Sequence, residues 1–149
     1  MSKSYENILR EFADHVGLDA NELLGTEEVL IDGLAVGLQL DGDAVDGDLL
    51  FFAALGTPSG EHLGRIARTL LEANNLWVGT GGATLGVQQA TGAVTLSGRM
   101  PLSALSGDAL AMLLDGFVDT ASFWKGFVEG APEDDGSLAR GIPSFDLRA

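Results

Sequence analysis

Hydrophobic residues recur at helical spacing in three segments of the sequence. The first follows Ser4, a good helix N-cap, ends at Gly17, and has an apolar stripe of Tyr5, Ile8, Leu9, Phe12, Ala13 and Val16. The second follows Ser59, ends at Asn74-Asn75, and has an apolar face of Leu63, Ile66, Ala67, Leu70 and Leu71. The third runs from Ser106 to about Val128. These spacings predict three helices, and Asp19 and Glu22 favour one short helical turn between the first helix and residue 28.

The third helical segment carries more apolar surface than one packing face needs. Its main stripe is Leu110, Leu113, Leu114, Phe117, Ala121, Trp124 and Val128, and a second stripe beside it contains Met112, Gly116, Phe123 and Phe127. Together the two stripes span about half of the helix circumference. This width predicts a second packing partner for the helix.

Between the first two helices the hydrophobic period changes from helical to two. Val29 and Ile31 precede Asp32-Gly33, a hairpin signal, and Leu34, Val36, Leu38 and Leu40 then alternate with small or polar residues. Residues 41–48 (DGDAVDGD) have the composition of a turn. Residues 49–55 (LLFFAAL) are apolar at every position, which predicts a strand covered on both faces.

A second hairpin is predicted between the second and third helices. The segment ATLGVQQ is followed by the turn Ala90-Thr91-Gly92 and by AVTLSGRMPL. The resulting order is α-β-β-β-α-β-β-α, with strands in two hairpin-type groups. We therefore predict an α+β fold with a mainly antiparallel twisted sheet packed by helices.

Composition narrows the classes of protein that fit this pattern. The 149 residues include 22 Asp and Glu against 8 Lys and Arg, a net charge of −14, and 46% are hydrophobic. So apolar a chain can bury enough surface to fold, and so acidic a chain is poorly suited to nucleic acid or to an anionic membrane. Cysteine is absent, and from the pattern of apolar residues we expect neither a secretory leader nor a membrane span. We expect a cytoplasmic protein whose partners are neither nucleic acid nor membrane.

Three features of the sequence are candidates for a metal-binding, phosphate-binding or catalytic site. The Asp-rich turn does not match a calcium loop, because the positions that need an oxygen ligand, a glycine and the final glutamate are Val45, Asp46 and Phe52. The segment GTGGATLG lacks the lysine of a phosphate-binding loop. His15 and His62 are isolated from each other, and each only neighbours an acid on the same helix. We expect no catalytic residue, no metal site and no cofactor.

Residues 70–129 resemble the second half of the Tir chaperone (CesT-type) family, the class I chaperones of type III secretion. The shared pattern is a Leu-Leu-x-Ala-Asn helix end, a Thr-Gly-Gly-Ala-Thr-Leu-Gly strand entry, a Thr-Gly turn, an Arg-x-Pro-Leu strand end, and a final helix with an aromatic residue near a tryptophan. Here these are Leu70–Asn74, Thr80–Gly86, Thr91-Gly92, Arg99–Leu102, and Phe117–Trp124. The first half agrees in element order and acidity.

The resemblance implies a bacterial cytoplasmic homodimer that takes part in virulence. Its partner would be the N-proximal region of a secreted effector, held unfolded and delivered to the secretion apparatus, with the secretion ATPase as a further candidate partner. By element, effector contact would fall on Ile8, Leu9, Phe12, Leu34, Val36, Leu38, Leu49, Phe51 and Ala53. The dimer interface would fall on Leu63, Ile66, Leu70, Trp77, Leu85 and Val87.

The likeness also suggests how the chain divides. Residues 1–130 would form one chaperone-like domain, and residues 131–149, with the acidic run Glu133 to Asp135, would form a mobile tail that is idle or shields the binding surface. Two other functions stay open at this point. One is a regulatory adaptor of the same fold that binds another secretion component or a transcriptional regulator. The other is a small enzyme with an unrecognised site.

Overall fold

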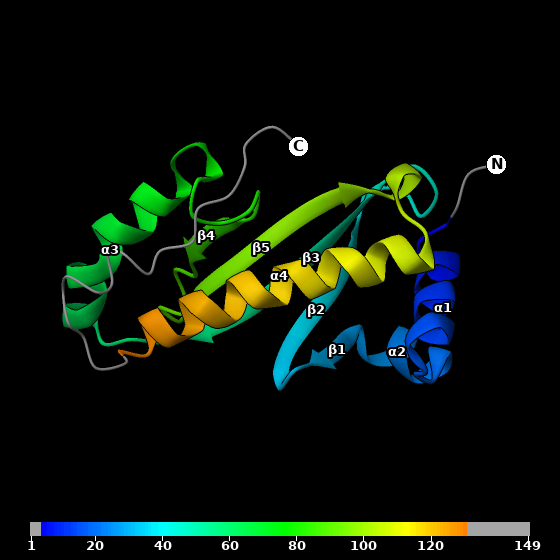
Figure 1. Ribbon diagram of the computed structural model, residues 1–149, viewed down its shortest axis with the longest axis horizontal. Coiled ribbons are helices and arrows are strands. Elements are labelled where there is room, and N and C mark those ends of the chain that lie inside the picture. The colour runs from blue at the N-terminus through cyan, green and yellow to red at the C-terminus, as the bar shows by residue number, and fades with distance from the viewer. Residues whose placement is uncertain (1–3, 131–149) are drawn as a thin grey trace. The chain divides into compact units, whose positions relative to one another are not determined.

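The computed structural model describes residues 4–130, and its helices and strands follow the predicted order with one helix added (Figure 1). The elements are α1 (Tyr5–Val16), α2 (Ala20–Thr26), β1 (Glu28–Ile31), β2 (Leu34–Asp41), β3 (Asp48–Gly56), α3 (Gly60–Asn74), the 3-10 turn η1 (Asn75–Trp77), β4 (Thr84–Val87), β5 (Val94–Pro101), the 3-10 turn η2 (Leu102–Ala104) and α4 (Gly107–Val128). The tail predicted at residues 131–149 lies outside the described residues.

The first two helices begin or end at the capping residues that the sequence predicts. The Ser4 Oγ accepts a hydrogen bond from the Asn7 N–H at 3.1 Å, and Gly17 closes α1 in the left-handed region at φ 81°. Asp19 caps α2, which extends for seven residues rather than the single turn predicted. The additional length buries Leu23, which is 3% exposed.

The sheet has the order β1-β2-β3-β5-β4, so β1 and β4 are its edges. The first pair turns through Asp32 and Gly33, both at positive φ (51° and 82°), as a two-residue hairpin requires. The β2–β3 and β4–β5 pairs are also antiparallel. The α+β class and the two predicted hairpins are therefore confirmed.

The prediction that β3 is covered on both faces is wrong. Leu49, Phe51, Ala53 and Leu55 are buried, while Leu50 is half-buried and Phe52 and Ala54 are exposed. The run is uniformly apolar, so its sequence did not reveal which of its two faces is covered.

Two consecutive phenylalanines on β3 lie over glycines of neighbouring strands. A Cβ atom on Gly37 of β2 would stand 2.4 Å from the Phe52 ring, and one on Gly98 of β5 would stand 2.4 Å from the Phe51 ring. Phe51 also meets Phe117 of α4 edge to face, with ring centroids 5.0 Å apart. Side chains larger than hydrogen at Gly37 and Gly98 would displace both rings.

The chain forms two compact units, unit 1 (Met1–Phe52 and Gly98–Val118) and unit 2 (Ala53–Ser97 and Asp119–Ala149). In the described part of unit 1, buried side chains come from α1, β2, β3 and α4, for example Ile8, Leu38, Leu49 and Leu110. The predicted single domain over residues 1–130 stays a prediction.

Trp124 organises the core of unit 2. Its Nε1–H donates to the Gly79 carbonyl at 2.8 Å, and its ring meets Phe123 and Phe127 edge to face. Gly79 lies so close to Ala73 that a Cβ atom would stand 2.8 Å from the Ala73 Cβ. The glycine-rich link is therefore a packing element beneath a tryptophan.

The helix-ending Asn74 has a second structural role in unit 2. Its Nδ2–H donates to the Leu85 carbonyl and its Oδ1 accepts from the Leu85 N–H, both at 2.8 Å. The side-chain amide thus bonds the edge strand β4 as a neighbouring strand would.

Among the helices at residues 4–130, none combines the length and apolar character that a membrane crossing needs.

We predict that Gly79→Ala lowers the free energy of unfolding by about 1 to 3 kcal/mol, because the new methyl group overlaps Ala73 beneath Trp124. The matched control is Gly64→Ala in the middle of α3, where a Cβ atom meets nothing within 4 Å. The control is expected to stabilise by about 0.5 to 1 kcal/mol. Urea unfolding followed by tryptophan fluorescence measures both, and equal effects would contradict the packing role of Gly79.

Candidate functional site

The nine residues predicted to contact an effector are all buried in the chain's own core. Ile8, Leu9, Phe12, Leu34, Val36, Leu38, Leu49, Phe51 and Ala53 are each no more than 6% exposed. The expectation that they present open apolar surface is wrong. The physical reason is that the strongest apolar stripe of a helix or strand is the one its own core needs.

An open apolar groove lies in unit 1, and of the nine predicted residues only Phe12 lines it. It has a volume of about 520 Å³ and is formed by the end of α1, the β1 hairpin and α4. The large side chains it exposes are Val16, Leu18, Leu30 and Met112, of which Leu30 is 71% and Met112 76% exposed. Exposed hydrophobic side chains gathered at one hollow are typical of a docking site for an apolar segment.

Residues of β1 line the groove. This strand is an edge of the sheet (Figure 1). The Leu38 N–H donates to the Glu27 carbonyl at 2.8 Å, so by the alternation of an antiparallel ladder Val29 and Ile31 bond to β2. The N–H and C=O of Leu30 then point away from β2, to the open edge. At Glu28 the same groups meet the Thr26 hydroxyl at 3.3 Å. The edge therefore offers one residue, Leu30, for pairing with another strand.

A buried phenol ties the start of α1 to the start of β1. The Tyr5 Oη donates to the Glu27 carboxylate at 2.5 Å, and Glu27 is held at a left-handed φ of 52°. Burial first, and then the hydrogen bond and negative charge of Glu27, raise the pKa of Tyr5 far above its usual value. This hydrogen bond, which we call the Tyr5–Glu27 clip, holds together the two elements that flank the groove.

The Asp-rich turn at residues 41–48 is held by the protein's own groups. Arg99 of β5 pairs with Asp41 at 2.8 Å and with Asp48 at 2.9 Å, and Asp48 and Asp41 raise the pKa of Arg99. The Asp43 carboxylate accepts from the Val45 and Asp46 N–H groups, which lowers its pKa. Within residues 4–130, no group of three or more His, Asp or Glu side chains is placed to hold a metal ion.

In unit 2 the predicted dimer residues divide into buried and exposed groups. Ile66, Leu70 and Leu85 are buried, Leu63 is half-buried, and Trp77 and Val87 are about half exposed. Three further large side chains, Leu71, Leu76 and Val78, are exposed on the same two elements or between them. Three consecutive apolar residues, Leu76-Trp77-Val78, follow the end of α3. This run is visible in the sequence, but it fits no helical or strand period, so periodicity did not predict the exposed surface that it forms.

The backbone of this exposed run is unusual. Leu76 and Trp77 both adopt positive φ, 55° and 56°, which a bulky residue rarely does.

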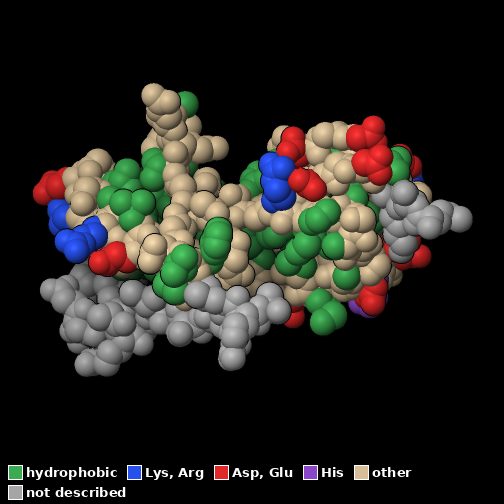
Figure 2. Space-filling model, turned by 90° about the horizontal axis from the view of Figure 1, so that it is seen from above, with side chains coloured by type: hydrophobic (Ala, Val, Ile, Leu, Met, Phe, Trp, Pro, Cys, Tyr) green, Lys and Arg blue, Asp and Glu red, His purple; other side chains and the backbone are tan. Residues whose placement is uncertain are grey.

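The surface in Figure 2 shows hydrophobic side chains in more than one group, with acidic side chains nearby. The protein thus offers apolar surface in each of its two units.

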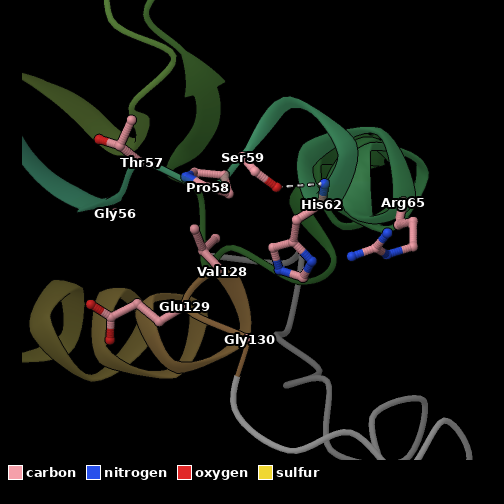
Figure 3. A pocket seen from close by; sticks show the side chains of 9 residues that line it. All are labelled: Gly56, Thr57, Pro58, Ser59, His62, Arg65, Val128, Glu129 and Gly130. Atoms are coloured by element: carbon pink, nitrogen blue, oxygen red, sulfur yellow. Dashed lines mark hydrogen bonds between the residues drawn. The ribbon is translucent and has the colours of Figure 1, made fainter.

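A second pocket of about 610 Å³ lies in unit 2, and its lining includes the polar side chains of Thr57, Ser59, His62, Arg65 and Glu129 (Figure 3). His62 projects from the first turn of α3 towards Gly130, whose added Cβ atom would stand 3.6 Å from the His62 Nε2. The Ser59 Oγ accepts from the His62 backbone N–H at 3.1 Å and serves as the helix cap. Among the described residues that line this pocket, no hydroxyl hydrogen-bonds to the His62 imidazole, so no nucleophile–base pair is formed there.

Comparison with known proteins identifies the class to which this fold belongs. The family model described as the Tir chaperone protein (CesT) family matches residues 7–125. The chain therefore belongs to the Tir chaperone protein (CesT) family. A search of curated protein sequences found no match.

Two solved structures show the same fold. The ExsC–ExsE complex aligns with a TM-score of 0.61 and 21% identity, over 86% of this chain and 97% of the other. The HopA1–SchA chaperone–effector complex also aligns at 0.61 and 21%, over 81% of this chain and 92% of the other. The resemblance read from residues 70–129 is confirmed, and the family match extends it into the first half of the chain.

We predict that Tyr5→Phe lowers the free energy of unfolding at pH 7 by about 1 kcal/mol, because the Glu27 carboxylate loses its phenol donor. A raised pKa in the folded state stabilises below the ordinary phenol pKa of about 10, and this stabilisation is lost as the pH rises further. Urea unfolding at pH 7 and at about pH 11 should therefore show the difference between the two proteins shrinking at high pH.

The sequence contains a single tyrosine, so absorbance of the phenolate reports on Tyr5 alone. A stability difference that stays constant across this pH range would contradict the clip.

Proposed function

We propose that this protein is a chaperone that binds the N-proximal segment of a type III secretion effector, keeps it unfolded and assists its delivery to the secretion apparatus. Membership of the CesT family supports the class, and the chaperone–effector complex among the similar structures supports the type of partner. The observation that carries the proposal is the open apolar groove beside the free edge of β1.

The geometry suggests how an extended segment would bind. A strand laid along β1 would exchange two backbone hydrogen bonds with Leu30, and its alternate side chains would cover Leu30 and Met112. Two such hydrogen bonds contribute about 1 to 3 kcal/mol, and each covered side chain adds about 1.5 to 3 kcal/mol. Because ordering the segment costs several kcal/mol, a client needs more than this one contact, which favours a segment that extends over further patches.

This mechanism is binding without catalysis. Sequestration acts by covering apolar client residues that would otherwise associate, and it needs neither nucleophile nor cofactor. Delivery to a secretion ATPase belongs to the same proposal, with the cytoplasm as its site.

A second part of the proposal is that the protein acts as a homodimer through unit 2. Leu71, Leu76, Trp77, Val78 and Val87 are exposed there, and apolar surface of this kind favours an interface. The buried members of the predicted set, Ile66, Leu70 and Leu85, would support this surface from beneath. Leu63, half-buried on α3, belongs to the same proposed interface.

We predict that the double variant Leu30→Asp, Met112→Asp loses the client. Both side chains are mostly exposed, so the charges should leave folding intact while placing two carboxylates in the apolar groove. The measurement is co-purification with the first ~100 residues, about one domain length, of the protein encoded beside this one. Val45→Asp, an exposed site in the turn 41–48 of the same unit, is the matched control.

Full retention of the client by the double variant would remove the groove from the proposal. Copurification of a transcriptional regulator in place of any secreted protein would favour the regulatory adaptor instead.

We predict that the wild-type protein has twice the 15.5 kDa chain mass in solution, and that Trp77→Asp with Val87→Asp halves it. Charges at two exposed apolar positions oppose burial in an interface. Size-exclusion chromatography with light scattering gives the mass, and Val45→Asp again serves as the control. A wild-type protein that runs as a monomer would contradict the dimer.

A further inference from the structure

The groove of unit 1 carries two carboxylates that lack a basic partner in the described chain. Asp32 stands at the β1–β2 turn and Asp115 on α4, and both line the groove. His15 is the only other titratable side chain that lines it. No ion pair joins a Lys, Arg or His at residues 4–130 to either aspartate.

The basic side chains of the described residues are all occupied elsewhere. Each of the five pairs with a carboxylate within 3.4 Å, and the five are Arg10, Arg65, Arg68, Arg99 and Lys125. Four of these pairs are formed with a residue four positions away, on the same helix for Arg10, Arg65 and Arg68 and directly after the end of α4 for Lys125. The groove therefore combines apolar walls with a local negative charge that its own surroundings do not neutralise.

We propose that the groove selects client segments that carry Lys or Arg among the apolar residues on their groove-facing side, with Asp32 and Asp115 as the residues that determine this preference. This inference rests on the proposed function and names the chemistry of the segment that the groove accepts. Apolar side chains of the segment contact Leu30 and Met112, while its cations lie near Asp32 and Asp115. An acidic segment is repelled by the same two carboxylates.

The overall charge works in the same direction. A protein of net charge −14 attracts a basic segment at long range and repels a second copy of itself. Long-range attraction is screened by salt and depends on total charge, whereas a local preference depends on the two aspartates. The experiment has to separate these two contributions.

The probes are two fluorescein-labelled synthetic peptides of about twelve residues, long enough to exceed the four-residue β1. In one, arginine, valine and leucine all stand at every second position, so that they share one face of an extended strand, and uncharged polar residues stand between them. In the other, glutamine replaces every arginine. Titration with the full-length protein, followed by fluorescence anisotropy at about 0.05 M and about 0.5 M salt, gives the four affinities. Two exposed ion pairs should favour the basic peptide by about fivefold at low salt and by less at high salt.

The test variant is Asp32→Asn with Asp115→Asn, which should remove the local part of the preference and keep only the part that the remaining net charge supplies at low salt, while leaving the affinity for the glutamine peptide unchanged. The matched control is Asp46→Asn with Asp119→Asn, which removes the same charge from exposed positions outside the groove. The control is expected to keep most of the preference. Circular dichroism confirms that both variants fold.

Equal loss of the preference in test and control variants would overturn the inference, because total charge alone would then explain it. Equal affinity of the wild-type protein for both peptides would overturn it too, while leaving the groove as a client site. A third outcome is that neither peptide binds, that the wild-type protein is a dimer, and that the variant Leu30→Asp with Met112→Asp is a monomer. The groove would then bind a second copy of the chain, and its role as the client site in the proposed function would be wrong as well.

Discussion

The placement of two phenylalanine rings over two glycines is the constraint on which the first unit of the fold depends. Phe51 and Phe52 point to opposite faces of β3, one over Gly98 and the other over Gly37. A slip of one residue in the pairing of β2 with β3 would place Phe51 on the outer face and Phe52 in the core, away from their glycines. The register is therefore specified on both faces, although the strand is apolar throughout. A fixed register also fixes which side of β1 and β2 faces the core, and so which side chains remain available at the sheet edge.

Core and candidate binding surface belong to the same elements but to different faces or ends of them. Helix α1 buries Ile8, Leu9 and Phe12 and offers Val16 at its last turn. Strand β1 buries Val29 and exposes Leu30, and α4 buries Leu110 and Leu114 and exposes Met112. The most continuous apolar stripes are buried in the core, and the surface left for a partner consists of side chains at the ends of those stripes or beside them. Two acidic residues, Asp32 and Asp115, line this surface, and each basic residue of the described chain pairs with a carboxylate elsewhere.

Local sequence rules predicted most of the elements, because caps and tight turns depend on neighbouring residues. Ser4, Gly17 and Asp32-Gly33 act where they were expected to act. Of the residues that line the candidate groove, Phe12 was among those predicted and the others were not, since burial depends on which face the rest of the chain covers. Periodicity identified Leu34, Val36 and Leu38 as an apolar set but not as core. The pairing of Asn74 with Leu85 and the exposed run Leu76-Trp77-Val78 are tertiary features that periodicity did not reveal.

The contact of the Thr26 hydroxyl with the backbone of Glu28 has a consequence for how the protein avoids aggregating. A long open sheet edge invites continuous pairing between identical chains, which is the route to fibrils. Here the edge strand has four residues, one of which already meets a threonine hydroxyl, and only Leu30 presents both backbone groups outward. Two copies that met edge to edge would gain a single pair of hydrogen bonds and would bring many carboxylates together. A long unfolded chain can add contacts beyond the edge, whereas a folded copy cannot. The same edge can therefore bind an unfolded chain without pairing with a second folded copy.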